Sequence, residues 1–131
     1  MRGDELAIQF GDTYYWKDGG HLWVVISDPT IHCGEFVAVN LTTDEFRAGK
    51  DCELNVGDHK WITKKTYVCF GAAMKLGPRE EANLLKQIAI GTIKTHSPMS
   101  PVVLAKITSV VTSKAAICGH FKTGHMDWPE T

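Results

Sequence analysis

The chain has 131 residues, of which 44% are apolar and 22% are charged, and its formal net charge is −1. This size and composition predict one soluble domain, residues 1–131, with a single core. The near-neutral charge excludes a globally basic nucleic-acid-binding protein, so any such binding must use a local patch. No apolar run reaches the roughly 20 residues of a membrane span, and the start, MRGDELAIQF, lacks the apolar stretch of a signal peptide. We therefore expect a cytoplasmic protein without a membrane partner.

Six short runs in the first part of the chain are rich in branched and aromatic residues, which favour strands. Turn signals such as Asp18-Gly19-Gly20 separate them. The segment Asp44–Lys50 predicts a loop or short turn, and Gly71–Leu76 is ambiguous. The predicted strands are Asp12–Lys17, Leu22–Ser27, Glu35–Thr42, Cys52–Val56, Trp61–Thr63 and Thr66–Phe70.

The pattern becomes helical after Gly77-Pro78. A first helix begins at Arg79, with an apolar stripe that continues to Thr92 or Ile93. His96-Ser97-Pro98 interrupts it, and Ser100-Pro101 then predicts a second helix start, with serine as the N-cap. This helix ends at Gly119 or earlier, near Thr112 or Ser113, and residues 120–131 form a loose tail.

The order of elements predicts a mainly β protein with C-terminal helices, an α+β class. About five to six short consecutive strands favour a small barrel or curled sheet over residues 8–76. Residues 78–119 form a helical C-terminal extension with two helices. These helices either cover an open end or face of the sheet or form a dimer contact.

The cysteines do not form any CxxC pair, so we expect reduced thiols and no structural zinc. Other potential metal ligands show no helical i, i+4 spacing, and we expect neither a metal nor another cofactor. The cysteines are Cys33, Cys52, Cys69 and Cys118, and the other potential ligands are His21, His32, Asp51 and His59.

The ordered segments GDTYYW, GGHLWVVISDP, VAVNLTT, LNVGDHKWI and TYVCFGAAMKL span Gly11–Leu76, about half of the chain. This pattern resembles the PemK/MazF-like toxin superfamily, and an outlying branch of it with a long helical C-terminus. The resemblance implies an SH3-like barrel. It also implies metal-independent cleavage of single-stranded RNA, an antitoxin protein as partner, and a homodimer.

The resemblance implies a catalytic role only for those residues of this chain that match the catalytic residues of the family. Family members have a threonine or serine at the end of the second core strand, which is Thr42 or Thr43 here. Their arginine after the later strand aligns with Met74, which has no charge or donor. Lys75 beside it supplies charge without the bidentate guanidinium. His21 stands where an arginine often precedes the first core strand.

Cleavage of RNA by its own 2′-hydroxyl needs a base, an acid and a cation near the phosphate. His21 and His59 lie in glycine-rich turns and are candidate acid–base groups. Asp28 and Asp58 could orient them, and Ser27 lies at the same strand end as Asp28. The alternative is structural: turn histidines are often solvated or bonded to backbone, and Asp58 could simply cap its turn.

The segment from Lys60 to Tyr67 interleaves basic and aromatic residues, which suits a single nucleic-acid strand. The alternative is a solvated edge strand with Trp61 packed inward. Trp16 and Trp23 are expected in the core. The candidate RNA-binding residues are Lys60, Trp61, Lys64, Lys65 and Tyr67.

Three functions follow. The first is a toxin-like endoribonuclease, which requires a cleft where Thr42, His21 or His59, and Lys75 converge. The second is a non-catalytic barrel that binds protein or nucleic acid, and Met74 in the arginine position favours it. The third is an assembly protein, which would bury Val103, Ile107 and Val111 between chains.

Overall fold

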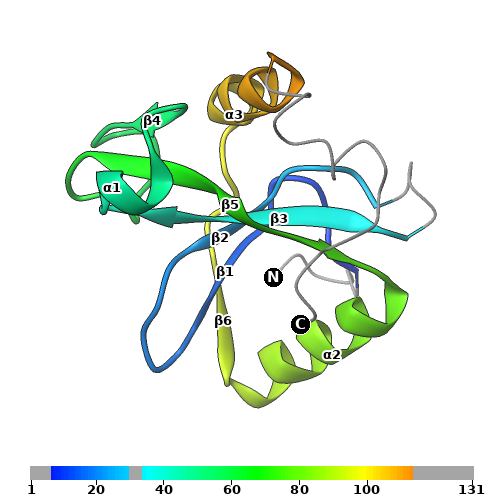
Figure 1. Ribbon diagram of the computed structural model, residues 1–131. Helices are drawn as coiled ribbons and strands as arrows, with labels where there is room; N and C mark the ends of the chain where they lie inside the picture. The colour runs from blue at the N-terminus through cyan, green and yellow to red at the C-terminus, as the bar shows by residue number, and fades with distance from the viewer. Residues whose placement is uncertain (1–6, 30–33, 114–131) are drawn as a thin grey trace.

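The computed structural model describes residues 7–29 and 34–113 (Figure 1). The predicted tail 120–131, the possible helix end at Gly119, and both Cys33 and Cys118 lie outside these ranges. Within them, no helix is long and apolar enough to cross a membrane. The elements are β1 (Thr13–Trp16), β2 (Trp23–Val25), β3 (Phe36–Thr42), α1 (Glu45–Ala48), β4 (Glu53–Leu54), β5 (Thr66–Leu76), α2 (Pro78–Ile90), β6 (Ile93–His96) and α3 (Pro101–Ser113).

The strands form one antiparallel sheet in the order β4-β5-β3-β2-β1-β6. The predicted α+β class, mainly β with two larger helices after the first five strands, is confirmed. Among the described strands, β4 and β6 are the edges and do not pair with each other, so the sheet is open. Closure of the sheet into an SH3-like barrel is therefore not confirmed.

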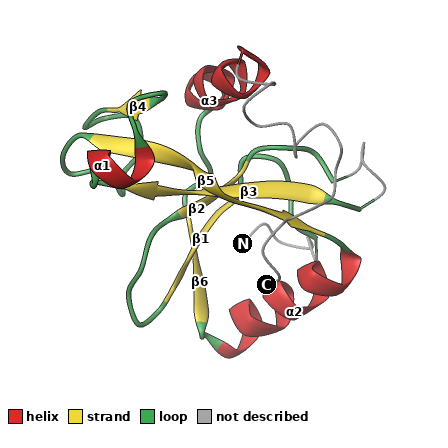
Figure 2. Cartoon of the chain, in the orientation of Figure 1, coloured by secondary structure: helices red, strands yellow, loops and turns green. Residues whose placement is uncertain are grey.

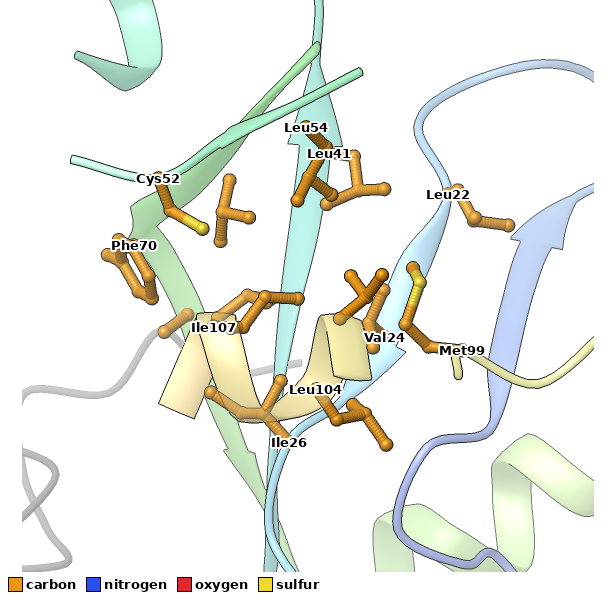
Figure 3. Close-up of a cluster of buried hydrophobic side chains, with 14 of the residues drawn as sticks. Leu22, Val24, Ile26, Leu41, Cys52, Leu54, Phe70, Met99, Leu104 and Ile107 are labelled. Atoms are coloured by element: carbon orange, nitrogen blue, oxygen red, sulfur yellow. The ribbon is translucent and has the colours of Figure 1, made fainter. Parts of the chain in front are cut away.

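The helices α2 and α3 lie on opposite sides of the sheet (Figure 2). On the α3 side, Val103, Leu104 and Ile107 pack against a cluster that includes Leu22 and Val24 (Figure 3). On the α2 side, Leu84 belongs to a second cluster with Tyr14, Val25 and Phe36. The helices therefore cover the two faces of the sheet, one of the two arrangements predicted for them. Val103 and Ile107 are buried within the chain, contrary to what an assembly protein requires.

A bulge in β5 connects these two layers. Ala38 pairs with Met74 and Asn40 with Cys69, so two steps along β3 match five along β5. The three extra residues are an odd number, which reverses the side-chain alternation of the strand. Val68 and Phe70 accordingly face the α3 cluster, whereas Leu76 faces the α2 cluster. This phase change explains why Gly71–Leu76 has no clear pattern in the sequence although it belongs to β5.

The first helix ends earlier than its apolar stripe predicted. Gly91 adopts a left-handed conformation with φ 89°, and the N–H groups of Gly91 and Thr92 bond back to the carbonyls of Ile88 and Gln87. This Schellman arrangement stops α2. Ile93 then begins β6, pairs with Trp16 and is 3% exposed. The prediction that Ile93 is helical was therefore wrong, because the glycine cap overrides the periodicity.

Two shorter segments also differ from their predictions. The expected loop Asp44–Lys50 contains the short helix α1. The predicted strand Trp61–Thr63 is a turn, because the Trp61 N–H bonds to His59 Nδ1 and the Ile62 N–H to the His59 carbonyl. Those donors are thus unavailable to a neighbouring strand. The second helix starts as predicted at Pro101, where the Ser100 Oγ accepts the Val103 N–H at 3.3 Å.

The packing of α3 on the sheet predicts how substitutions on this helix change the free energy of unfolding. Ile107 is fully buried in the cluster, so Ile107→Ala leaves a cavity and lowers the free energy of unfolding by about 2–5 kcal/mol. Val102 lies on the same helix but is 80% exposed, and Val102→Ala should change that free energy by less than about 0.5 kcal/mol. Urea unfolding followed by circular dichroism measures both. Equal effects would mean that α3 does not pack on the sheet in solution.

Candidate functional site

A cleft forms where the start of β2, the end of β3 and the start of β5 meet. The Leu41 N–H bonds to the Leu22 carbonyl at 2.9 Å, and Thr42 pairs with Tyr67. These antiparallel pairings place His21, just before β2, beside the polar end of β3. The cleft has a volume of about 220 Å³, and we call it the His21 cleft. Its lining residues are Gly20, His21, Leu41, Thr42, Thr43, Trp61, Thr63 and Thr66.

Threonine hydroxyls supply most of the polar groups of the His21 cleft. Thr42 Oγ1 accepts the Asp44 N–H at 3.1 Å, and Thr66 Oγ1 donates to the Lys64 carbonyl at 2.9 Å. Thr43 and Thr63 are exposed, and their hydroxyls bond to no other described residue. The cleft therefore offers two hydroxyls that are free to bond a ligand. Sequence reasoning missed Thr63 and Thr66, whose only signal was their position on either side of the Lys64-Lys65 turn.

Trp61 forms the aromatic wall of the His21 cleft. The indole is half-buried, and its ring lies 4.8 Å from the Tyr15 ring and 5.8 Å from the His96 ring, measured between centroids. Packing of this kind holds the ring in a fixed orientation. Trp61 thus combines the inward packing of the structural alternative with the cleft position that base stacking requires.

His59 is bonded to the backbone and does not line the cleft. The residue is 7% exposed; its Nδ1 accepts the Trp61 N–H at 3.0 Å, and its Nε2 lies 2.6 Å from the Ser97 carbonyl, to which it donates. These bonds occupy both ring nitrogens and fix the tautomer. The candidate acid–base group is therefore a structural residue in this conformation, as the alternative interpretation proposed.

Lys75 lies at the opposite end of the sheet from Thr42. It pairs with Val37, which lies five residues before Thr42 on β3. At about 3.4 Å per residue, this separation is about 17 Å. Its Nζ lies 3.7 Å from a carboxylate oxygen of Glu35. The required convergence of Thr42, a histidine and Lys75 is therefore incomplete: His21 meets Thr42 and Thr43, but Lys75 does not join them.

The residues predicted to support catalysis, Ser27, Asp28 and Asp58, lie outside the His21 cleft. Ser27 Oγ accepts the Val37 N–H at 2.8 Å, at the Lys75 end of the sheet, and Asp28 follows it there. Asp58 Oδ2 accepts the Asn55 N–H at 2.7 Å, which caps the turn. None of the three lines the His21 cleft.

The basic and aromatic strip is only partly available to a ligand. Lys60, Lys64 and Lys65 are exposed, and Lys65 lies 3.6 Å from Glu53. The Tyr67 ring is buried, and its hydroxyl donates to Glu45 on α1 at 3.2 Å, so it cannot stack on a base here. Trp16, expected in the core, is 40% exposed at the C-terminal end of β1, and Trp23 is half-buried.

The described residues contain no cluster of three or more histidine, cysteine, aspartate or glutamate side chains that could hold a metal ion. Cys52 and Cys69 are free, buried thiols. Comparison with known proteins adds no identity: no family model matches the chain, and no curated protein matches it. The resemblance to the PemK/MazF-like superfamily therefore stays a prediction.

The histidine pair beside the cleft makes the fold sensitive to acid. The His59 and His96 rings lie 5.0 Å apart, and His96 Nδ1 accepts the Ser97 N–H at 2.8 Å. Burial, followed by the nearby His59 and Lys60, lowers the pKa of His96. The unfolded chain therefore binds the proton more readily, and stability should fall as the pH drops through about 6.5, the usual histidine value.

Thermal unfolding between pH 7.5 and 5.5 measures this effect. We expect the melting temperature to fall with pH, and a His96→Gln variant to show a shallower dependence. His21→Gln, at a half-exposed position outside the pair, serves as control and should retain the wild-type dependence on pH. The assignment is wrong if the His96 variant keeps the full dependence.

Proposed function

We propose that the protein binds single-stranded RNA at the His21 cleft and does not cleave it. The observation that supports this most directly is the meeting of Trp61, the free hydroxyls of Thr43 and Thr63, and His21 in one cleft. A fixed aromatic ring suits base stacking, and hydroxyl and imidazole groups suit hydrogen bonds to a base edge or ribose. This is the binding form of the function that the sequence predicts.

The volume of the cleft agrees with a strand rather than a free cofactor. At about 220 Å³ it is smaller than the pockets of about 300–1,000 Å³ that enclose drug-sized ligands. We therefore infer that it holds one base, while the adjoining nucleotides lie on the surface. Lys60 and Lys64, which flank Trp61 in the chain, are exposed and form no ion pair with another described residue. They supply the charge for the phosphates.

Cleavage is a poorer fit to the same residues. Transfer of the phosphate to the 2′-hydroxyl needs two proton-transfer groups and a charge that stabilises the phosphorane. Of the residues that line the cleft, only His21 has an acid–base side chain, and none is a lysine or an arginine. His59 is held by the backbone, and Lys75 pairs with Glu35 at the other end of the sheet. The geometry thus supports recognition more than catalysis.

Binding can be measured by fluorescence anisotropy with a labelled single-stranded RNA of mixed sequence over a series of salt concentrations. The double variant Lys60→Gln/Lys64→Gln should weaken binding and reduce the slope of log K against log [salt] by about 1.4, since each phosphate contact contributes about 0.7 on a single strand. Lys86→Gln is the matched control, because Lys86 is an exposed lysine on α2. Trp61→Phe should weaken binding while leaving the salt slope unchanged.

The proposal is contradicted if the folded protein does not bind the RNA at low salt. It is also contradicted if Lys86→Gln weakens RNA binding as much as Lys60→Gln/Lys64→Gln does. In that case a protein partner becomes the better candidate. Phe46 on α1 is 99% exposed and follows Thr43 and Asp44 closely in the chain, so it would be the first residue to test.

Absence of cleavage is tested separately by incubating purified protein with a long single-stranded RNA in EDTA. We expect the RNA to stay intact over hours, because the described cleft lacks a second proton-transfer group. Metal-independent cutting that His21→Ala abolishes and His96→Gln preserves would show that the protein is a ribonuclease. The non-cleaving proposal would then be wrong, although RNA would remain the ligand.

A further inference from the structure

A second cavity lies between the sheet and α2 and shares no residue with the His21 cleft. Its volume is about 500 Å³, within the range of about 300–1,000 Å³ typical of small-molecule sites. We call it the α2 pocket. The strands β1, β5 and β6 form its floor, and the first turns of α2 form its wall. Its apolar lining comes from Trp16, Met74, Leu76, Leu84 and Ile93.

Trp16 gives the α2 pocket a partly exposed aromatic surface. It is 40% exposed, although β1 lies inside the sheet between β2 and β6. Its ring makes edge contacts with the Tyr14 and Trp23 rings, at centroid distances of 6.1 Å and 6.5 Å. Met74, on the β5 segment after the bulge, adds an adaptable side chain. A flat ring bound here would cover the exposed indole.

Tyr14 contributes a hydroxyl group to the α2 pocket. The residue lines the α2 pocket and is only 2% exposed, and its hydroxyl bonds to no described residue. Burial raises the pKa of Tyr14 far above its ordinary value, so the hydroxyl keeps its proton and acts as a neutral donor. An acceptor atom on a bound ligand would satisfy it.

The polar residues at α2 indicate the charge of that ligand. Arg79 is exposed in the first turn and forms no ion pair with another described residue, and Asn83 lies one turn further along the same side. Both line the α2 pocket. Together with the positive end of the helix dipole they favour an anion. Glu80 Oε1 accepts the Gly77 N–H at 2.8 Å, which keeps a negative charge nearby and disfavours a dianion.

We propose that the α2 pocket binds a small aromatic monocarboxylate, with its ring against Trp16 and Met74 and its carboxylate on Arg79 and Asn83. A hydrogen-bond acceptor on the ligand meets the Tyr14 hydroxyl. This site is independent of the RNA proposed at the His21 cleft, and either can be wrong without the other.

The test uses isothermal titration calorimetry on the full chain with 2-naphthoate and its uncharged analogue 2-naphthamide. We expect 2-naphthoate to bind with a dissociation constant below 1 mM, on the order of tenfold more tightly than the amide. Arg79→Gln should remove that difference, because only the carboxylate uses the guanidinium. Lys86→Gln, an exposed cation of the same helix outside the α2 pocket, should preserve it.

Two further variants separate binding from folding. Asn83→Trp fills the mouth of the α2 pocket from an exposed position and should abolish binding, whereas Ala82→Trp, also exposed but outside the lining, should not. The proposal is overturned if naphthoate and naphthamide bind equally, if neither binds at 1 mM, or if Asn83→Trp leaves binding intact.

Discussion

The reversal of side-chain alternation within β5 is the constraint on which the other layers depend. A regular strand of this length would direct its apolar residues towards one face, and the opposite helix would have less to pack against. The bulge lets Val68 and Phe70 serve the α3 cluster and Leu76 serve the α2 cluster. One strand thereby contributes to both cores, and the sheet can be covered on both faces with only two larger helices. The same bend brings Met74 into the floor of the α2 pocket.

The chain must also cross from the α2 face to the α3 face, and it does so at Ser97. The Ser97 carbonyl accepts bonds from the Thr13 hydroxyl and from His59 Nε2, and the next fixed point is the Met99 N–H on the Gly11 carbonyl. Gly11 itself has φ 93°, where an added Cβ would meet Leu104. The glycine and histidine of the GDTYYW and GDHKW segments therefore hold the crossover. Those segments carry information about fold, and their presence does not by itself imply an active site.

This division explains what could be predicted from the sequence. Branched and aromatic runs located β1, β2, β3 and the first half of β5, and Ser100-Pro101 located α3, because each signal is local. The strand β6 was missed because the apolar stripe of the helix continues by chance past the glycine cap, to Thr92 or Ile93. The role of His59 was open because its partner is 38 residues away. The grouping of His21 with Thr42 was predictable, because these residues lie on two adjoining strands. Lys75 is distant because it lies eight residues along β5 from Tyr67, the partner of Thr42, and this follows only once the pairing of β3 with β5 is known.

The histidines show why recognition is the better interpretation of the His21 cleft. A general acid–base pair needs two groups that can exchange protons with the substrate, and these must be free to move. Three described histidines lie close to the cleft or its supporting wall, but two of them, His59 and His96, bond to the backbone around Ser97, and their tilted rings lie 5.0 Å apart. To release either one for catalysis would loosen the crossover between the two faces of the sheet. The fold thus uses for its own stability the groups that cleavage would require, and leaves His21 with hydroxyls and an indole as its neighbours.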